Sequence, residues 1–298
     1  MQSIKQSSKP ANSFTLLPTF SLLLSASLWG LIWYPLRLLE EAGLSGLWST
    51  LFIYLGTLPV LLYLLHGRYH EFRQAPWLLL GLALASGWCN VSFVLAVLDG
   101  NIVRVLLLFY LSPFWATLIG WWFLGEHIHR SSLLVLAVAM VGAIIMLWHV
   151  EMGLPFPEST ADWLALSSGF SFAISNAFVR KAHHISIQTR TSTGWLGVLL
   201  IVLVLLFIFT PTLGEAAGLT MLAALLIGLF GITIMTLTVV YGVTHMPLHR
   251  SAIILLFEII VGAVSSQLLT NEVISVQEWF GGALVMLAAF LSAKKQAE

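Results

Sequence analysis

Apolar stretches long enough to cross a lipid bilayer follow one another along almost the whole chain. A membrane-spanning helix needs about 20 predominantly apolar residues. Ten segments reach or approach this length: Phe14–Leu38, Leu47–His66, Trp77–Leu98, Asn101–Leu124, Ser132–Trp148, Trp163–Val179, Thr193–Phe209, Met221–Val243, Leu248–Leu269 and Val276–Ala293. Only 9% of the residues are charged, against about 25% in a soluble domain. We therefore predict an all-α polytopic membrane protein with ten transmembrane helices, joined by connections too short for a soluble domain.

Basic residues gather on one side of these predicted helices. With the N-terminus placed in the cytoplasm, all of the 13 Lys and Arg residues except Arg37 and Arg104 fall on the cytoplasmic side. An excess of basic residues in short loops marks the cytoplasmic face of a membrane. We therefore predict that both termini are cytoplasmic and that the protein is a multi-pass protein of a bacterial-type inner (plasma) membrane. The first apolar run continues to Leu36, which favours a spanning helix over a cleaved signal peptide.

The two halves of the chain carry the same residues at corresponding positions. A constant shift along the sequence gives the matches Arg104 with Arg250, Glu126 with Glu272, Ala137 with Ala283 and Met140 with Met286. We interpret residues 14–149 and 161–293 as two repeats of five helices each. Because five is odd, the second repeat crosses the membrane in the opposite sense. Inverted repeats are typical of transporters with a substrate site near the bilayer midplane; a duplication without a transport role is the alternative.

The segment "GNIVRVLLLFYLSPFWATLIGWWFLGEHI", which begins at Gly100, carries a family resemblance. It resembles the EamA-type repeat of the drug/metabolite transporter superfamily, whose fourth helix has a proline after "LS" and ends in "LGE". Here these are Leu111-Ser112-Pro113 and Leu124-Gly125-Glu126, and the second half has "LFE" ending at Glu258. The resemblance implies a secondary carrier that exports amino acids, other metabolites or drugs, with aromatic amino-acid exporters among its relatives.

Two departures from the family pattern lie in the second half. Ile259 stands where the family often has a proline, and Asn271 replaces the glycine before Glu272. Because a proline ring bends a helix, we expect the ninth helix to be straighter than in the relatives.

Glu258 lies at the centre of the apolar run Ala252–Val264. An acidic residue at this depth costs about 2.5–3.5 kcal/mol on insertion scales, so intramembrane carboxyl groups usually have a function. We predict that Glu258 faces a water-accessible central cavity, where it binds a substrate ammonium group or a proton. The alternative is a protonated structural carboxyl group that is hydrogen-bonded to a neighbouring helix.

The fourth helix is expected to supply the opposite wall of this cavity. Pro113 has no backbone N–H, so it frees the carbonyl group of Phe109 and bends the helix. The candidate cavity residues are Trp29, Trp33, Tyr34, Asn90, Tyr110, Ser112, Pro113, Trp115, Asn176 and Glu258. For the indoles and amides, interfacial belts and interhelical hydrogen bonds remain the alternative. Arg104 is a candidate for the outer mouth and for coupling, with a local pair to Asp99 as the alternative.

Other classes of function find less support. The nine histidines lie at predicted helix ends or in loops, so we interpret them as solvated and predict no metal site. No phosphate-binding loop is present, and Ser45 in the motif Gly43–Gly46 lacks a mid-membrane base. We predict no enzyme activity and no cofactor, and a formal charge of zero gives no reason to expect nucleic acid. The expected partners are a small-molecule substrate, the lipid bilayer and a proton as candidate coupling ion, with a monomer as the candidate assembly.

The sequence thus predicts a secondary-active exporter of small amphipathic metabolites, with aromatic or neutral amino acids as the substrate class, working by alternating access around a central cavity. Export of cationic drugs or of another small metabolite is the alternative.

Overall fold

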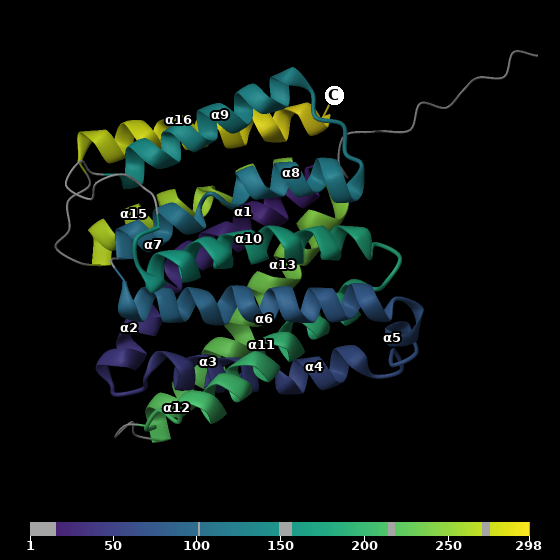
Figure 1. Ribbon diagram of the computed structural model, residues 1–298, viewed down its shortest axis with the longest axis vertical. Helices are drawn as coiled ribbons and strands as arrows, with labels where there is room; N and C mark the ends of the chain where they lie inside the picture. The colour runs from purple at the N-terminus through teal and green to yellow at the C-terminus, as the bar shows by residue number, and fades with distance from the viewer. Residues whose placement is uncertain (1–15, 101, 149–156, 214–217, 270–274, 298) are drawn as a thin grey trace, which may run out of the picture.

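The computed structural model describes residues 16–100, 102–148, 157–213, 218–269 and 275–297, with the side chains of 97–99, 102–104 and 293–297 left aside. Within these ranges the regular structure is entirely helical (Figure 1). The first half contains α1 (Leu17–Leu31), α2 (Trp33–Glu41), α3 (Gly46–Gly56), α4 (Leu58–Leu65), α5 (Glu71–Gln74), α6 (Pro76–Asp99), α7 (Ile102–Phe109), α8 (Ser112–Leu124) and α9 (Arg130–Leu147). The second half contains α10 (Thr160–Lys181), α11 (Ile187–Phe209), α12 (Gly218–Leu226), the π-helix η2 (Ile227–Ile232), α13 (Thr233–His245), α14 (Leu248–Leu255), α15 (Phe257–Leu269) and α16 (Val276–Ala297).

Seven helical stretches of the described chain are long and apolar enough to cross a membrane, and the bent pair α3 and α4 raises the number to eight. The all-α membrane class predicted from the sequence is therefore confirmed. The two other predicted segments are helical as well: one lies within α10, and the other is the shorter apolar helix Val276–Ser292. Ten spans, their inverted arrangement and the side of the termini stay predictions.

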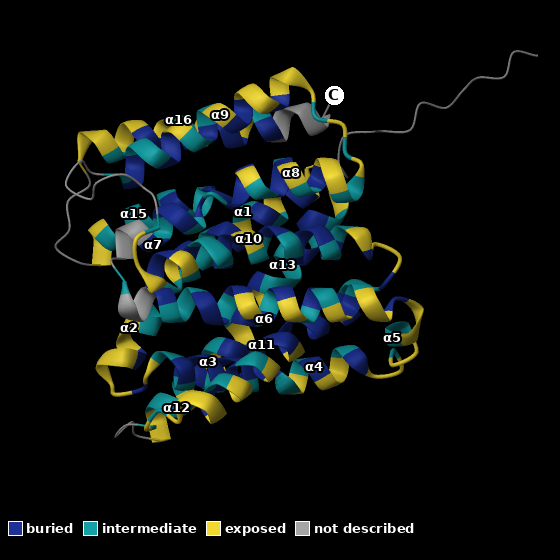
Figure 2. Ribbon diagram, viewed as in Figure 1, coloured by how far each residue is buried: buried dark blue, intermediate teal, exposed yellow. Residues whose placement is uncertain are grey.

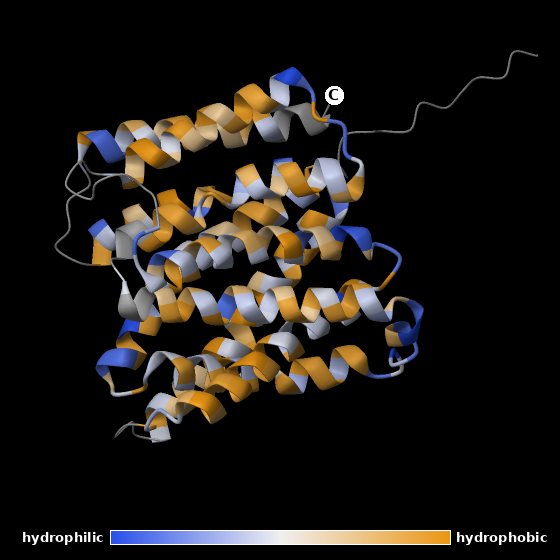
Figure 3. Cartoon of the chain, in the orientation of Figure 1, coloured by the Kyte–Doolittle hydropathy of each residue, from blue (hydrophilic) through white to orange (hydrophobic). Residues whose placement is uncertain are grey.

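Apolar and polar residues separate along the helices as a bilayer requires. Hydrophilic residues gather at the two ends of the bundle, and hydrophobic residues fill the length between them (Figure 3). Many outward faces that are exposed in Figure 2 carry large apolar side chains, among them Phe207, Trp122 and Trp77. Exposed apolar faces on helices of this length suit acyl chains as the surrounding solvent.

Several of the predicted spans are interrupted near their middle. Helices α1 and α2 meet at Ile32, α3 and α4 at Thr57, and α7 and α8 at Tyr110 and Leu111. A proline follows within three residues of each break: Pro35, Pro59 and Pro113. Because a proline ring displaces the carbonyl group four residues before it and has no N–H to donate, these interruptions follow from the sequence.

The ninth predicted helix is also interrupted, at Leu256. That it is straighter than in the relatives stays a prediction. Helix α14 ends at Leu255 and α15 begins at Phe257, and between them Leu256 and Ile259 donate backbone hydrogen bonds three residues back instead of four. No proline is present here. The backbone carbonyl of Glu258 instead packs so closely on α1 that a Cβ atom at Gly30 would lie 2.6 Å from it. The break between α14 and α15 thus coincides with tight packing on α1. The corresponding break between α7 and α8 in the first half is instead explained by Pro113.

Contacts between helices follow a pattern that recurs in the two halves. Helix α6 packs against α10 and α11, while α13 packs against α1 and the α12–η2 stretch packs against α3. Helices α7 and α8 pack against α10, and α15 packs against α1 in the same way. Helices α9 and α16 pack against each other at one edge of the bundle (Figure 1). Each of these helix pairs therefore has a counterpart when every helix is replaced by the corresponding helix of the other half.

The contact between α9 and α16 depends on glycine. A Cβ atom at Gly142 would lie 2.8 Å from the carbonyl oxygen of Gly281, and one at Gly281 would lie 2.6 Å from the carbonyl oxygen of Gly142. Small residues let membrane helices approach to backbone contact. The two helices thus form a closely packed pair on which α14 also rests.

Candidate functional site

A small cavity lies where the fourth and ninth predicted helices are interrupted. Its lining comes from the α7–α8 junction, from α10 and from the α14–α15 junction, with the residues Phe109, Tyr110, Ser112, Phe172, Ala252, Leu255, Leu256 and Glu258. The cavity has a volume of about 10 Å³, which is room for roughly one water molecule. The sequence predicted that Tyr110, Ser112 and Glu258 belong together, and the structure brings these three to one cavity.

The carboxyl group of Glu258 has a specific partner in this cavity. The Tyr110 hydroxyl donates a hydrogen bond to it, which connects the α7–α8 junction with the first turn of α15. Glu258 lies in the first turn of α15, where the partial positive charge of the helix N-terminus favours an anion. A carboxyl group with one tyrosine partner keeps oxygen lone pairs free for a substrate cation or for a proton.

The cavity is much smaller than the water-accessible hollow that the sequence led us to expect. A volume of about 10 Å³ excludes any amino acid, and the apolar neighbours Phe109, Phe172 and Leu255 close it. The cavity is therefore closed in this structure, and a water-accessible cavity at Glu258 stays a prediction. Helix breaks lie on both sides of the closed cavity.

The three candidate aromatic residues of the first predicted helix have different neighbours. Trp33 donates a hydrogen bond from Nε1 to the Ser265 hydroxyl at 2.9 Å. The ring of Tyr34 meets Trp33 edge-on with centroids 5.5 Å apart, and Trp29 packs against the cluster that includes Leu47 and Met235. The structure thus connects Trp33 with α15 through a hydrogen bond about two helical turns beyond Glu258.

The remaining predicted cavity residues have more varied surroundings. Asn90 on α6 accepts a hydrogen bond from the Tyr54 hydroxyl at 2.9 Å, an interhelical bond of the kind named as the alternative. Pro113 is buried at the start of α8, and Asn176 is buried on α10. Trp115 packs edge-on against Phe170, and its Nε1 is buried without a hydrogen-bond partner in the described part of the chain.

The side chain of Arg104 lies outside the described residues, so the prediction for it stays a prediction. Among the residues that are described, no group of three or more His, Cys, Asp or Glu residues has the arrangement of a metal site.

A second polar cluster, centred on Glu126, has no counterpart among the predicted site residues. Gly125 adopts φ +68° and ends α8, which turns Glu126 back toward the bundle. Its carboxylate accepts hydrogen bonds from the Arg180 Nε, from the Leu248 backbone N–H at 3.1 and 3.0 Å, and from the His249 Nδ1 at 3.4 Å. It thereby caps the N-terminus of α14 and ties it to α10.

Electrostatics at Glu126 follow from these contacts. Burial alone raises the pKa of a carboxyl group, but the hydrogen bonds from His249 and Leu248 and the charge of Arg180 outweigh burial and hold the pKa of Glu126 below its ordinary value of 4.5. Glu126 is therefore ionised at neutral pH. The "LGE" motif signals this residue in the sequence, but its partners lie 54 and more positions away, which the sequence alone does not reveal.

His249 corrects one interpretation of the sequence. We expected all nine histidines to be solvated, yet the residue is only 5% exposed and contacts Glu126. The reason is that the chain turns sharply at Pro247, and the first turn of α14 packs beneath the α8–α9 connection.

Arg190 is a further buried cation. It is 2% exposed, and its Nη1 donates to the Val179 carbonyl and, at 2.8 Å, to the Thr244 hydroxyl. One turn before Arg190, the backbone N–H and the hydroxyl group of Ser186 donate hydrogen bonds to the carboxylate of Glu71. Partial burial raises the pKa of Glu71, but these hydrogen bonds and Arg68 lower it overall.

Apolar helices of membrane-spanning length, interrupted around the carboxyl group of Glu258, define a multi-pass membrane protein. A profile of the EamA-like transporter family matches residues 16–148 and again residues 159–294. The chain therefore belongs to the EamA-like transporter family of the drug/metabolite transporter superfamily.

One protein sequence and one solved structure are also similar to this chain. An uncharacterized transporter from Pseudomonas aeruginosa is 25% identical over 201 residues, which is 64% of this chain and 63% of that protein. The chain thus spans somewhat less than two thirds of that relative's length. One crystal structure superposes with a TM-score of 0.71 at 17% sequence identity and covers 95% of this chain and 99% of the other. At this identity the likeness concerns the fold alone.

Proposed function

We propose that this transporter is a secondary-active exporter of small amphipathic metabolites, with aromatic or neutral amino acids as its substrate class. In this proposal Glu258 binds the substrate's ammonium group or the coupling proton, and the cavity at the helix breaks is the closed form of the substrate site. The observation that carries it is the Glu258–Tyr110 pair at the point where α7–α8 and α14–α15 are both interrupted.

The chemistry of the Glu258–Tyr110 pair supports a role in which Glu258 binds and releases a ligand. A carboxyl group on an apolar helix is costly, and a purely structural one would be expected to use all of its hydrogen-bonding capacity. Among the described residues Glu258 has one side-chain donor, Tyr110, and its neighbours in the cavity are mostly aromatic or aliphatic. Such surroundings suit a ligand that has a cationic end and an apolar body, because aromatic faces attract cations.

Alternating access is supported by the recurring helix contacts. If the two halves have opposite orientation, exchange of their conformations opens the site first to one side and then to the other. The breaks at Tyr110–Leu111 and at Leu256 then act as joints in the two central helices. Between the two openings the site is closed, as the cavity of about 10 Å³ is.

Export of cationic drugs or of another small metabolite is the second candidate. The same carboxyl group and aromatic lining would receive an organic cation without a carboxylate. An amino acid brings a carboxylate as well, which requires a cationic or N–H partner near the opened site. Competition distinguishes the two: neutral amino acids displace a labelled amino acid, and organic cations do not.

The test is counterflow in proteoliposomes with wild type and Glu258→Gln. We expect saturable counterflow of a labelled aromatic amino acid by the wild type and a loss of at least about tenfold in the variant, because an amide neither carries the charge nor exchanges the proton. Glu41→Gln is the matched control, since Glu41 is an exposed carboxyl group paired with Arg37. Equal rates and equal pH dependence for wild type and Glu258→Gln would contradict the role of Glu258.

A further inference from the structure

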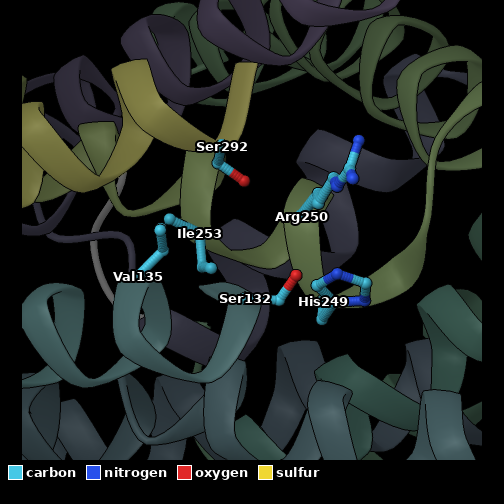
Figure 4. Close-up of a pocket in the computed structure, with 6 residues that line it drawn as sticks. All are labelled: Ser132, Val135, His249, Arg250, Ile253 and Ser292. Carbon is cyan, nitrogen blue, oxygen red and sulfur yellow. The ribbon is translucent and has the colours of Figure 1, made fainter. Parts of the chain in front are cut away.

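A second cavity lies between α9, α14 and α16, away from Glu258. Its polar lining is Ser132, His249, Arg250 and Ser292, and Val135 and Ile253 form an apolar side. Figure 4 shows the hydroxyl groups of Ser132 and Ser292 directed into the space that His249 and Arg250 border. The volume is about 10 Å³, so an occupant is about the size of one water molecule.

Three of these side chains have unused hydrogen-bonding capacity. The Nε2 of His249, the Nε of Arg250 and the Oγ of Ser292 are buried and have no hydrogen-bond partner among the described residues. His249 and Ser292 are 5% and 4% exposed. A buried polar atom without a partner is costly, and three around one small space indicate a shared ligand.

The charges around the cavity indicate the sign of that ligand. Within the described part of the chain Arg250 has no ion pair, and the nearby carboxylate of Glu126 is already bonded to Arg180. Ser132 is in the first turn of α9, and His249 and Arg250 are in the first turn of α14. Helix N-termini carry partial positive charge. The local excess of positive charge therefore favours an anion.

We propose that this cavity binds one small monovalent anion of the size of chloride. The Nε–H of Arg250 and the hydroxyl group of Ser292 are its donors, and Ser132 lies beside it. His249 faces the Glu126 carboxylate with Nδ1 and borders the anion with Nε2. The bound anion joins α14 to the α9–α16 pair. Larger anions such as phosphate or a substrate carboxylate do not fit the volume.

The proposal is tested by thermal unfolding of the purified full-length protein in detergent. Chloride is replaced by gluconate at constant ionic strength and constant pH. We expect the melting temperature to rise with chloride, because a ligand of the native state stabilises it by mass action.

Variants assign the effect to the cavity. In Arg250→Gln and in Ser292→Val the chloride-dependent rise disappears, while Arg130→Gln, an exposed arginine of the same α9 terminus, retains it. In a bromide-soaked crystal of the wild type, an anomalous peak between His249, Arg250 and Ser292 supports the proposal without any variant. Melting temperatures that are equal in chloride and gluconate, or a chloride effect that persists in Arg250→Gln, overturn it; the first outcome assigns the cavity to water.

Discussion

Two carboxyl groups, Glu126 and Glu258, occupy opposite situations in the same bundle. Glu126 accepts hydrogen bonds from Arg180, His249 and the Leu248 backbone, outside the membrane-spanning segments. In the described part of the chain Glu258 has one side-chain donor, Tyr110, beside a small cavity within the apolar stretch. A group with several fixed partners holds helices in place, whereas a group with one neutral partner remains available to a ligand. The number of hydrogen-bond donors around each carboxyl group, rather than its charge, therefore distinguishes the structural Glu126 from the candidate transport residue Glu258.

Loss of the carboxylate at Glu126 is expected to change the free energy of unfolding more than the other substitutions do. In Glu126→Gln the guanidinium group of Arg180, which is only 26% exposed, loses its counter-ion. Breaking a buried ion pair costs about 3–5 kcal/mol, and partial exposure of Arg180 places the loss at about 3 kcal/mol. The measurement is the free energy of unfolding in mixed micelles with denaturing detergent.

Glu41→Gln is the control for Glu126→Gln, because the Arg37–Glu41 pair is exposed on both sides and such pairs contribute about 0–1 kcal/mol. Equal destabilisation by the two variants would contradict a structural role that is specific to Glu126.

Acidification tests the cluster around Glu126 in the wild type, because it protonates the carboxylate without a substitution. The folded-state pKa of Glu126 is lowered from 4.5, so its stabilising contribution is complete above about pH 4.5 and is lost as the pH falls through the folded pKa. The wild type therefore loses stability below this value more steeply than Glu126→Gln does. Because Glu71 is shifted in the same direction, the difference between the two unfolding profiles isolates Glu126. Parallel profiles would show that the ionised form of Glu126 is not what stabilises α14.

The Tyr110 hydroxyl is expected to matter less for stability. Tyr110→Phe removes one hydrogen bond to Glu258 and leaves the ring in place, which costs about 1 kcal/mol. The same unfolding assay measures this loss. A cost as large as that of Glu126→Gln would place Glu258 among the structural carboxylates and remove the contrast between the two regions.

The positions of most helices could be predicted closely from the sequence, because a membrane-spanning helix is a continuous apolar segment. The predicted segment Leu248–Leu269 has the same ends as α14 and α15, and Asn101–Leu124 differs from α7 and α8 by one residue. The segment predicted to begin at Thr193 begins instead at Ile187. Its first turns hold Arg190 and three hydroxyl residues, which are polar yet buried and therefore lower the hydropathy without ending the helix.

The site was partly predictable for a similar reason. Glu258 is conspicuous as a lone charge in an apolar run, and Tyr110 and Ser112 follow from the motif around Pro113. The cluster at Glu126 was not predictable as a site, since its partners Arg180 and His249 come from distant segments and look like ordinary loop residues. The closed volume of the cavity depends on how Phe109, Phe172 and Leu255 pack, which no sequence pattern reports.

The account depends most on the cavity at Ser112 opening to water during transport. Cys89 is the chain's single cysteine and is buried, so a Cys89→Ala background with Ser112→Cys gives one addressable thiol. The measurement is the labelling rate of that thiol by a membrane-impermeant reagent, applied from each side of oriented vesicles. The account predicts labelling from both sides, slowed by transported substrate. A thiol that reacts from neither side while transport proceeds would contradict it.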